Sequence, residues 1–395
     1  MSRLETAILS FLLIVTPTLL RGQEIVIQDS ATFIKSSLVV ITPGPSSYSS
    51  LGHCALRMEC PSEGLDYCFS LEMEGGAKEH VQFFMGNAIA GVFGIPTRQF
   101  IVPYQQEGRG IRQYELNLTL KEKQQLWKSL DEEIVKPPHL KFNFLNTNCV
   151  MMCMQMIEGA LTDESLHFPH LPSYMLEDNG ERIRYITRDR PWQQFIYILL
   201  AGSACDLAYD IEYTLSPETI VEVLQDAEIH GSGPSRSLLA GEVATLLKET
   251  NKEASSSIPP ALLFSSILLL VVIASLIDFH TRRHSISSVI DVILLTAQTL
   301  IGIFLLYTSM AANLFGTRWN WYLIPFAPLP LIIWLIGHKK DSFYQIYLIY
   351  TIVLAVFIGC TPLSSQLDWT HQLAIAPLLV RSTMLFIEGK KDAKK

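Results

Sequence analysis

The feature that most constrains this fold is the strongly apolar last third of the chain. Beyond about Ser257, five apolar segments follow one another: Pro260–Ile277, Val289–Met310, Tyr322–Gly337, Phe343–Cys360 and Leu373–Ile387. Each is close to the roughly 20 residues that a helix needs to cross a hydrocarbon layer of about 30 Å. Only 17% of all residues are charged, whereas about 25% is typical of soluble domains. The sequence therefore predicts an all-α transmembrane bundle of about five helices in residues 258–395.

The charges between these segments predict how the bundle is oriented. Three basic clusters, Arg282/Arg283, Lys339/Lys340 and Lys390–Lys395, all fall on one side of a five-span bundle, and the connections on the other side contain only Arg318. Cytoplasmic loops of membrane proteins are enriched in Lys and Arg. We therefore expect a cytoplasmic C-terminus and an exported N-terminal part.

The N-terminus has the pattern of a secretory signal peptide. Arg3 precedes an apolar run from Ala7 to Leu20, and a polar sequence follows Gly22. The run is too short for a typical membrane span, so we expect residues 1–22 to be removed. The alternative is a retained N-terminal anchor. In both cases we expect residues 23–257 to form an exported domain.

The charge of the exported part limits its partners, and its cysteines are candidates for disulfides. Residues 1–257 carry 20 Lys/Arg and 32 Asp/Glu, a net charge of −12, whereas residues 258–395 carry ten and six, a net charge of +4. An acidic domain lacks the basic surface that nucleic acid requires. Export permits disulfides, and Cys60 with Cys68 or Cys153 with Cys205 are candidate pairs, although the sequence leaves the connectivity open.

The exported part has the pattern of an α+β domain. Expected strands are residues 38–42, the paired segments 54–59 and 65–73, and residues 99–103 and 110–118. A helix is expected over 121–135, with Thr119 as its N-cap. A second helix should begin after Asn146 or Asn148, which places Cys149 in its first turn. The glycine-interrupted stretch Ala88–Ile95 is either a buried turn or a lip that dips toward the bilayer.

Two residues of this domain are candidate catalytic residues. His53 follows a turn rich in Gly, Ser and Pro at the head of a strand, and Cys149 opens a helix. A thiolate at a helix N-terminus is stabilised by unpaired N–H groups and by the helix dipole. The same N–H groups can hold an oxyanion, and a neighbouring His can move the thiol proton. As bare residues, however, a buried Cys and a lone His are usually structural.

The sequence motifs around these two residues favour a catalytic role over a structural one. Ser49-Ser-Leu-Gly-His-Cys-Ala-Leu-Arg57, then Asp66-Tyr67, and later Phe142-x-Phe-Leu-x-Thr-Asn-Cys149 resemble the periplasmic domain of the Lnb-type lipoprotein N-acyltransferases. That resemblance covers roughly residues 30–200, and the apolar third is similar to the family's membrane region. It implies a permuted papain-like (NlpC-like) fold in which the His precedes the Cys. It also implies that His53 is the catalytic histidine and Cys149 the nucleophile, with no cofactor.

A third polar residue that orients the His is expected, and several candidates remain open. Ser50, Ser70 and Glu72 are candidates for this role, and Asn148 is a further candidate as an orienting or oxyanion residue. On a strand, Cys54 should point away from the face that His53 uses, so we expect it to be structural. His167 and His170 lack further ligands at suitable spacing, so no metal site is predicted.

Two other features have both a structural and a membrane-related interpretation. Arg318, Trp319 and Asn320 lie in an outer connection and form either an aromatic belt or a floor that contacts lipid headgroups. The run Met151, Met152, Met154 and Met156 is either soft core packing or part of a lipid groove.

The resemblance implies that the chain transfers a fatty acyl group. Cys149 would take the acyl group from a phospholipid as a thioester and pass it to the α-amine of the lipidated N-terminal Cys of a diacylated lipoprotein. The partners would then be these two substrates and the lipid bilayer. One alternative is a membrane-tethered cell-wall amidase or peptidase with the same two residues. Another is a non-catalytic envelope assembly protein.

Overall fold

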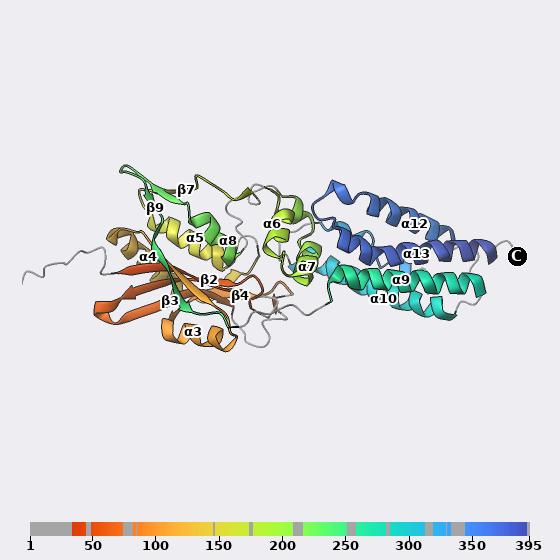
Figure 1. Cartoon of the computed structure of the whole chain (residues 1–395), viewed down its shortest axis with the longest axis horizontal. Helices are drawn as coiled ribbons and strands as arrows, with labels where there is room; N and C mark the ends of the chain where they lie inside the picture. The colour runs from red at the N-terminus through yellow and green to blue at the C-terminus, as the bar shows by residue number, and fades with distance from the viewer. Residues whose placement is uncertain are drawn as a thin grey trace, which may run out of the picture.

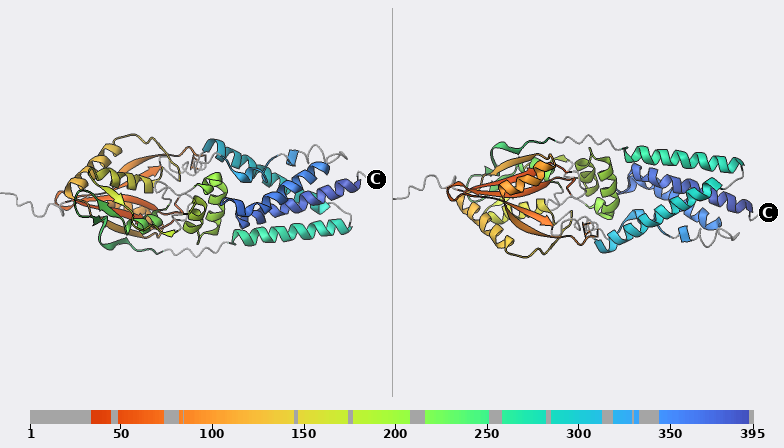
Figure 2. Two further views of the ribbon diagram at one scale, coloured as in Figure 1. Left: turned by 90° about the horizontal axis from the view of Figure 1, so that it is seen from above. Right: turned by 90° about the horizontal axis from the view of Figure 1, so that it is seen from below.

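The computed structural model describes residues 34–44, 49–73, 82–83, 85–144, 147–173, 177–207, 216–250, 258–281, 285–312, 319–328, 330–332 and 344–392. The predicted signal segment, residues 1–22, lies outside this set. A sheet domain occupies one end of an elongated molecule and a helical bundle the other (Figure 1). Helices α6 (Asn179–Ile186) and α7 (Pro191–Ala201) lie between them, as the views from above and below agree (Figure 2).

The sheet domain is built on antiparallel strands. The described residues form a seven-stranded sheet in the order β10-β5-β1-β2-β3-β4-β6 and a three-stranded sheet in the order β7-β8-β9. The strands are β1 (Lys35–Ile41), β2 (His53–Cys60), β3 (Leu65–Met73), β4 (Ile89–Pro96), β5 (Ile111–Leu116), β6 (Leu140–Lys141), β7 (Ser165–His167), β8 (Glu228–His230), β9 (Arg236–Ser237) and β10 (Leu239–Leu247). Every ladder in both sheets is antiparallel.

Helices cover both faces of the larger sheet because its strands are apolar on both sides. In β1, Leu38 and Val40 face one hydrophobic cluster, whereas Val39 and Ile41 face another. Successive side chains of a strand point to opposite faces. The first cluster includes α4 (Leu120–Ile134), α5 (Cys149–Ala160) and α8 (Pro217–Leu224). The second includes α3 (Thr97–Gln106), which lies in front of the sheet in the view from below (Figure 2).

Most predicted elements of this domain are confirmed, including both helix starts. Thr119 caps α4 in a capping box with Glu122, and Asn148 caps α5 through a bond from the Met151 N–H to its Oδ1. Asn146 lies outside the described residues. Met151, Met152 and Met154 are buried in the core, which favours core packing for the methionine run.

Two predictions for this domain are wrong. Residues 99–103 belong to helix α3 and not to a strand, because Phe100 packs on the sheet and Tyr104, one turn later, lies against Phe100. The apolar run Phe-Ile-Val at residues 100–102 has the composition typical of a strand. Residues 88–95 form neither a buried turn nor a lip: strand β4 pairs with both β3 and β6.

The candidate disulfides are absent, since all seven cysteines lie in the described residues and are free. Cys60 shares the face of Cys54 and Met58, whereas Cys68 lies in the cluster on the opposite face of the sheet. Cys153 belongs to the core of the sheet domain, and Cys205 to the cluster at the junction with the bundle. The thiols of each pair therefore point into different parts of the protein.

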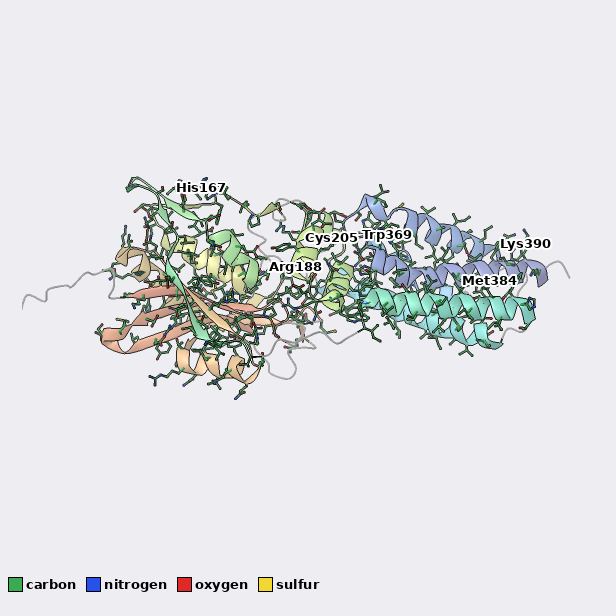
Figure 3. The ribbon with its side chains drawn as sticks, in the orientation of Figure 1. His167, Arg188, Cys205, Trp369, Met384 and Lys390 are labelled. Atoms are coloured by element: carbon green, nitrogen blue, oxygen red, sulfur yellow. The ribbon has the colours of Figure 1, made fainter. Side chains whose placement is uncertain are left out.

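The C-terminal part is an all-α bundle, as predicted. Among the described residues, three helices are long and apolar enough to span a membrane: Pro260–Thr281, Ile286–Ala311 and Trp369–Lys391. They correspond to α9 (Pro260–Thr281), α10 (Ser285–Tyr307) and α13 (Trp369–Asp392), and the apolar helix α12 (Tyr344–Gly359) packs on α13. Of the predicted span 322–337, residues 322–328 and 330–332 are described, and they begin with the 3-10 turn η7 (Trp321–Leu323). Residues 329 and 333–337 lie outside the described residues, as do Arg282, Arg283, Lys339 and Lys340. Trp369 lies at the sheet-domain end and Lys390 at the far end (Figure 3).

Polar contacts join the bundle to α6, α7 and the 3-10 turn η4 (Gly202–Asp206). His371 Nε2 hydrogen-bonds the Phe195 carbonyl at 2.8 Å, and the two rings stack with centroids 4.1 Å apart. Asp206 accepts bonds from the Ser364 hydroxyl and the Ser365 N–H. These contacts fix the sheet domain on the bundle.

Asn320 belongs to this junction and does not face lipid headgroups. It is fully buried, its amide donates to the Leu199 carbonyl at 2.7 Å, and its Oδ1 accepts from Gln366 at 2.6 Å. The headgroup interpretation of Asn320 is therefore wrong. Trp319 is 46% exposed and Trp369 68% exposed, as in an aromatic belt. Arg318 lies outside the described residues.

A buried ion pair ties three spans together. The guanidinium of Arg381 on α13 binds both carboxylate oxygens of Asp291 on α10 at 2.6 and 2.9 Å and donates to Ser275 on α9 at 2.9 Å. Arg381 and Asp291 are 4% and 3% exposed. Removing one partner of such a pair leaves an uncompensated charge in the interior.

We expect Asp291→Ala to lower the free energy of unfolding by about 3–5 kcal/mol, because Arg381 stays buried without its counter-ion. Thermal unfolding of the full chain in detergent measures this as a lower Tm. The matched control is Asp163→Ala, which breaks a pair with Lys121 whose side chains are 84% and 76% exposed and which should change stability by less than about 1 kcal/mol. Equal Tm values for the two variants would contradict the interpretation.

Candidate active site

The register of β2 against β3 assembles the polar part of the site. Ala55 pairs with Ser70, so the same register continued by two residues sets Glu72 opposite His53. All four side chains lie on one face of the sheet because strand residues alternate. His53 Nε2 lies 2.6 Å from Ser70 Oγ and 3.5 Å from Glu72 Oε1. The Ser70 hydroxyl donates to Glu72 at 2.6 Å.

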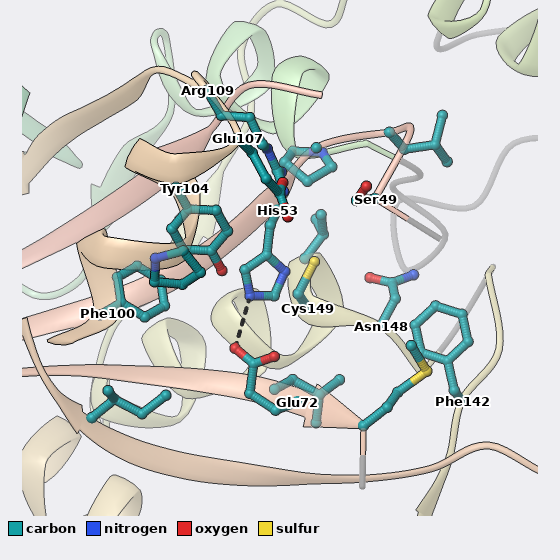
Figure 4. A pocket seen from close by; sticks show the side chains of 18 of the residues that line it. Ser49, His53, Glu72, Phe100, Tyr104, Glu107, Arg109, Phe142, Asn148 and Cys149 are labelled. Carbon is teal, nitrogen blue, oxygen red and sulfur yellow. Dashed lines mark hydrogen bonds and ion pairs between the residues drawn. The ribbon is translucent and has the colours of Figure 1, made fainter. Parts of the chain in front are cut away.

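These contacts determine which nitrogen of His53 carries the proton in the neutral ring. Because the Ser70 hydroxyl donates its hydrogen to Glu72, its oxygen accepts from His53 Nε2–H. The other ring nitrogen, Nδ1, is then free to exchange a proton elsewhere. In Figure 4 it faces the sulfur of Cys149.

Cys149 is held at this nitrogen by the start of α5. Asn148 caps the helix: its Oδ1 accepts from the Met151 N–H at 3.0 Å, and its Nδ2 donates to the Phe144 carbonyl at 2.9 Å. The Asn148 side chain therefore positions the helix, and the oxyanion donors are expected from the backbone N–H groups of the first turn. Helix α5 packs against β2, which brings residues 96 positions apart into contact.

The site favours a thiolate and an imidazolium. The pKa of Cys149 lies well below the usual range of a thiol, chiefly because the Cys54 thiol hydrogen-bonds it. Burial opposes this shift, and the charge and hydrogen bond of His53 add to it. Burial lowers the pKa of His53, but the Cys149 thiolate and Glu72 outweigh it and raise this pKa to about 10. Both shifts favour the thiolate–imidazolium form of the pair over the neutral form.

A cavity of about 450 Å³ opens beside this pair, within the range of small-molecule sites. Its charged and polar wall includes Tyr104, Glu107 and Arg109 (Figure 4). The rest is mostly apolar: Leu51, Leu71, Met73, Ile95, Phe100, Pro103, Phe142, Phe144, Val150 and Pro217. Leu51, Met73, Phe142 and Phe144 also belong to the hydrophobic cluster that contains Leu305 and Tyr322 of the bundle. The apolar wall is thus continuous with the outer end of the membrane helices.

The structure brings together some of the residues that the sequence singled out and separates others. His53, Cys149, Ser70 and Glu72 meet, whereas the Ser50 hydroxyl hydrogen-bonds Tyr197 at 2.6 Å and is not at the imidazole. No group of three metal-ligating side chains occurs among the described residues.

Three residues of the site were missed. Cys54 does point into the core on the α5 side, as alternation predicts, but Cys149 opens that same helix, so the Cys54 thiol contacts it and is more than structural. Tyr104 stacks near His53, with ring centroids 6.3 Å apart, and the strand predicted over 99–103 gives no reason to expect it there. No sequence signal indicated that Arg109 lines the cavity.

We expect Cys149 to react with iodoacetamide at about pH 6, where an ordinary thiol with a pKa near 8.5 is almost fully protonated. His53→Ala and Cys54→Ala each remove a cause of the lowered pKa, so both should move the reaction to higher pH. Peptide mass spectrometry at each pH gives the profile for Cys149, with Cys60 in the same samples as a buried control. Identical profiles in the wild type and both variants would refute the ionised pair.

Two family models match the chain, one for each part of the molecule. The Lnb N-terminal periplasmic domain matches residues 28–178, and the Lnb transmembrane domain matches residues 252–392. They account for 151 and 141 of the 395 residues, 292 in total. Neither a curated protein nor a solved structure matches the chain. The chain belongs to the Lnb family and is a membrane protein with a periplasmic N-terminal domain.

Proposed function

We propose that this protein is a lipoprotein N-acyltransferase that works through an acyl-thioester on Cys149. The observation that carries the proposal is the cavity at the Cys149–His53 pair, whose apolar wall joins the cluster at the outer end of the spans. An apolar wall of this kind suits a fatty acyl chain. Membership of the Lnb family supports lipoprotein processing as the setting.

In the first half-reaction the Cys149 thiolate attacks the carbonyl carbon of a fatty-acyl ester of a phospholipid. The carbonyl electron pair moves to oxygen, and N–H groups at the start of α5 stabilise the resulting oxyanion. When the pair returns, the C–O bond to glycerol breaks. The His53 imidazolium gives its Nδ1 proton to the leaving oxygen. The products are a lysophospholipid and the acyl-thioester, with neutral His53.

In the second half-reaction the free α-amine of the lipoprotein's lipidated N-terminal Cys attacks the thioester. His53 takes one proton from the attacking nitrogen, and the C–S bond breaks to regenerate the Cys149 thiolate. The product is an amide, and the enzyme returns to the ionised pair with which it started. Ser70 and Glu72 act as positioning residues, because they hold Nε2–H and keep Nδ1 directed at the reaction.

The membrane bundle supports the same reaction by holding the site where both lipid substrates are. In this proposal residues 1–22 are the signal segment, residues 23–257 the periplasmic domain and residues 258–395 the transmembrane domain of a protein of the bacterial inner membrane. The C-terminus is cytoplasmic. The basic residues Lys390 and Lys391, in the last turn of α13, support that orientation.

The cavity wall argues against a cell-wall amidase or peptidase with the same pair. A peptide or glycan substrate would need a cleft lined mainly by polar groups, whereas ten of the twenty residues that line this cavity have apolar side chains. A non-catalytic assembly role gives no reason for the Ser70–Glu72 chain on His53.

The test is acyl transfer in vitro from a phospholipid with isotopically labelled acyl chains to a diacylated lipopeptide. We expect the label in an amide on the N-terminal Cys and a triacylated product. Cys149→Ala should abolish transfer, and His53→Ala should slow it by about 10²–10⁴-fold. Cys60→Ser is the matched control, because Cys60 is buried at the far end of β2 and outside the cavity.

Two outcomes would contradict the proposal in distinct ways. An N-acylated product without label and with unchanged mass would mean that the acyl group moved within the lipopeptide, and the phospholipid donor would be wrong. Cleavage of a cell-wall peptide with no acyl transfer would replace the acyltransferase by the hydrolase.

A further inference from the structure

One wall of the cavity contains a buried guanidinium that the proposed chemistry does not use. Arg109 precedes β5 and is 5% exposed. Its Nε donates to the Thr42 carbonyl at 2.7 Å, and its Cζ lies 4.9 Å from the centroid of the Tyr104 ring. A backbone acceptor and an aromatic face therefore fix its orientation.

Only some of the N–H donors of this guanidinium have a hydrogen-bond partner within the protein. Nη2 is buried and has no hydrogen-bond partner. Nη1 donates to Glu107 Oε2 at 3.2 Å, but the Glu107 side chain is 40% exposed. An exposed carboxylate contributes little to such a pair. A buried donor without a partner requires an explanation, and a ligand oxygen in the cavity would provide one.

The chain packs closely around Arg109. A Cβ added to Gly44 would lie 3.1 Å from Arg109 Nη1 and 2.5 Å from Ser49 Oγ. Only glycine fits there without displacing a neighbour, so the backbone of this loop passes directly beside the guanidinium. This packing limits movement of Arg109 toward bulk solvent, and the residue lines the cavity.

We propose that Arg109 is the phosphate subsite of the active-site cavity and binds the phosphodiester of a phospholipid whose acyl ester lies at Cys149. The identity of this ligand rests on the proposed function. A guanidinium matches the geometry of phosphate oxygens with two parallel N–H donors. A phosphate oxygen would pair Nη2, and a second would replace Glu107 at Nη1. The subsite selects a donor by its headgroup, whereas the apolar wall accepts the acyl chain.

The test measures binding, so that it does not depend on turnover. Full-length Cys149→Ala protein in detergent is titrated with a short-chain phosphatidylglycerol, with the diacylglycerol of the same chains and with inorganic phosphate. We expect Arg109→Gln to weaken phosphatidylglycerol binding about 10- to 100-fold and to leave diacylglycerol binding unchanged. Arg109→Lys keeps the charge but not the planar fork, and should be intermediate.

The controls separate a binding effect from a folding effect. Arg112→Gln removes the same charge from an exposed position on β5 and should leave all three titrations unchanged. Alkylation of Cys149 in the otherwise wild-type Arg109 variants should match the wild-type protein, which shows that the site is folded.

Each remaining outcome overturns a defined claim. Equal weakening for phosphatidylglycerol and diacylglycerol, or no weakening for either, would overturn the phosphate subsite. Inorganic phosphate that binds as tightly as the lipid, with the same loss in Arg109→Gln, would make free phosphate the ligand and overturn the headgroup assignment. Acyl transfer from labelled phospholipid is measured separately, in the protein with Cys149. Its result tests the proposed function and does not depend on these titrations.

Discussion

The proposed chemistry depends on one contact between the start of a strand and the start of a helix. His53 begins β2 and Cys149 begins α5. Neither residue is activated alone: the imidazole is oriented by the Ser70–Glu72 chain, and the thiolate is stabilised by Cys54 and by His53. Burial opposes the charge on each group, so the ionised pair exists only because the two charges and their hydrogen bonds compensate it.

A second constraint is the attachment of the sheet domain to the bundle. One hydrophobic cluster runs from the cavity wall through α6 and α7 to the outer ends of the spans. Polar contacts at His371, Asn320 and Asp206 fix the angle between the two parts. The site is therefore held at a constant position relative to the helical bundle.

The sequence predicts the local elements well and the long-range contacts poorly. The capped starts of α4 and α5 were found because a cap is encoded within four residues. The strand prediction at 99–103 is wrong because buried Phe100 and partly buried Tyr104, one helical turn apart, pack together on the sheet and favour a helix. The choice between Ser50, Ser70 and Glu72 needed the β2–β3 register, which depends on pairing across a turn. Arg109 and Cys54 enter the site only through tertiary packing.

The central claim is tested most directly by the mass of Cys149 after brief contact with phospholipid. The full-length protein is incubated with phospholipid vesicles without any lipoprotein, quenched in acid and digested. The account predicts a peptide containing Cys149 that is heavier by one fatty acyl group and loses it to hydroxylamine, and no such peptide in Cys149→Ala. An unmodified Cys149, or an acyl group on another residue, would contradict the account.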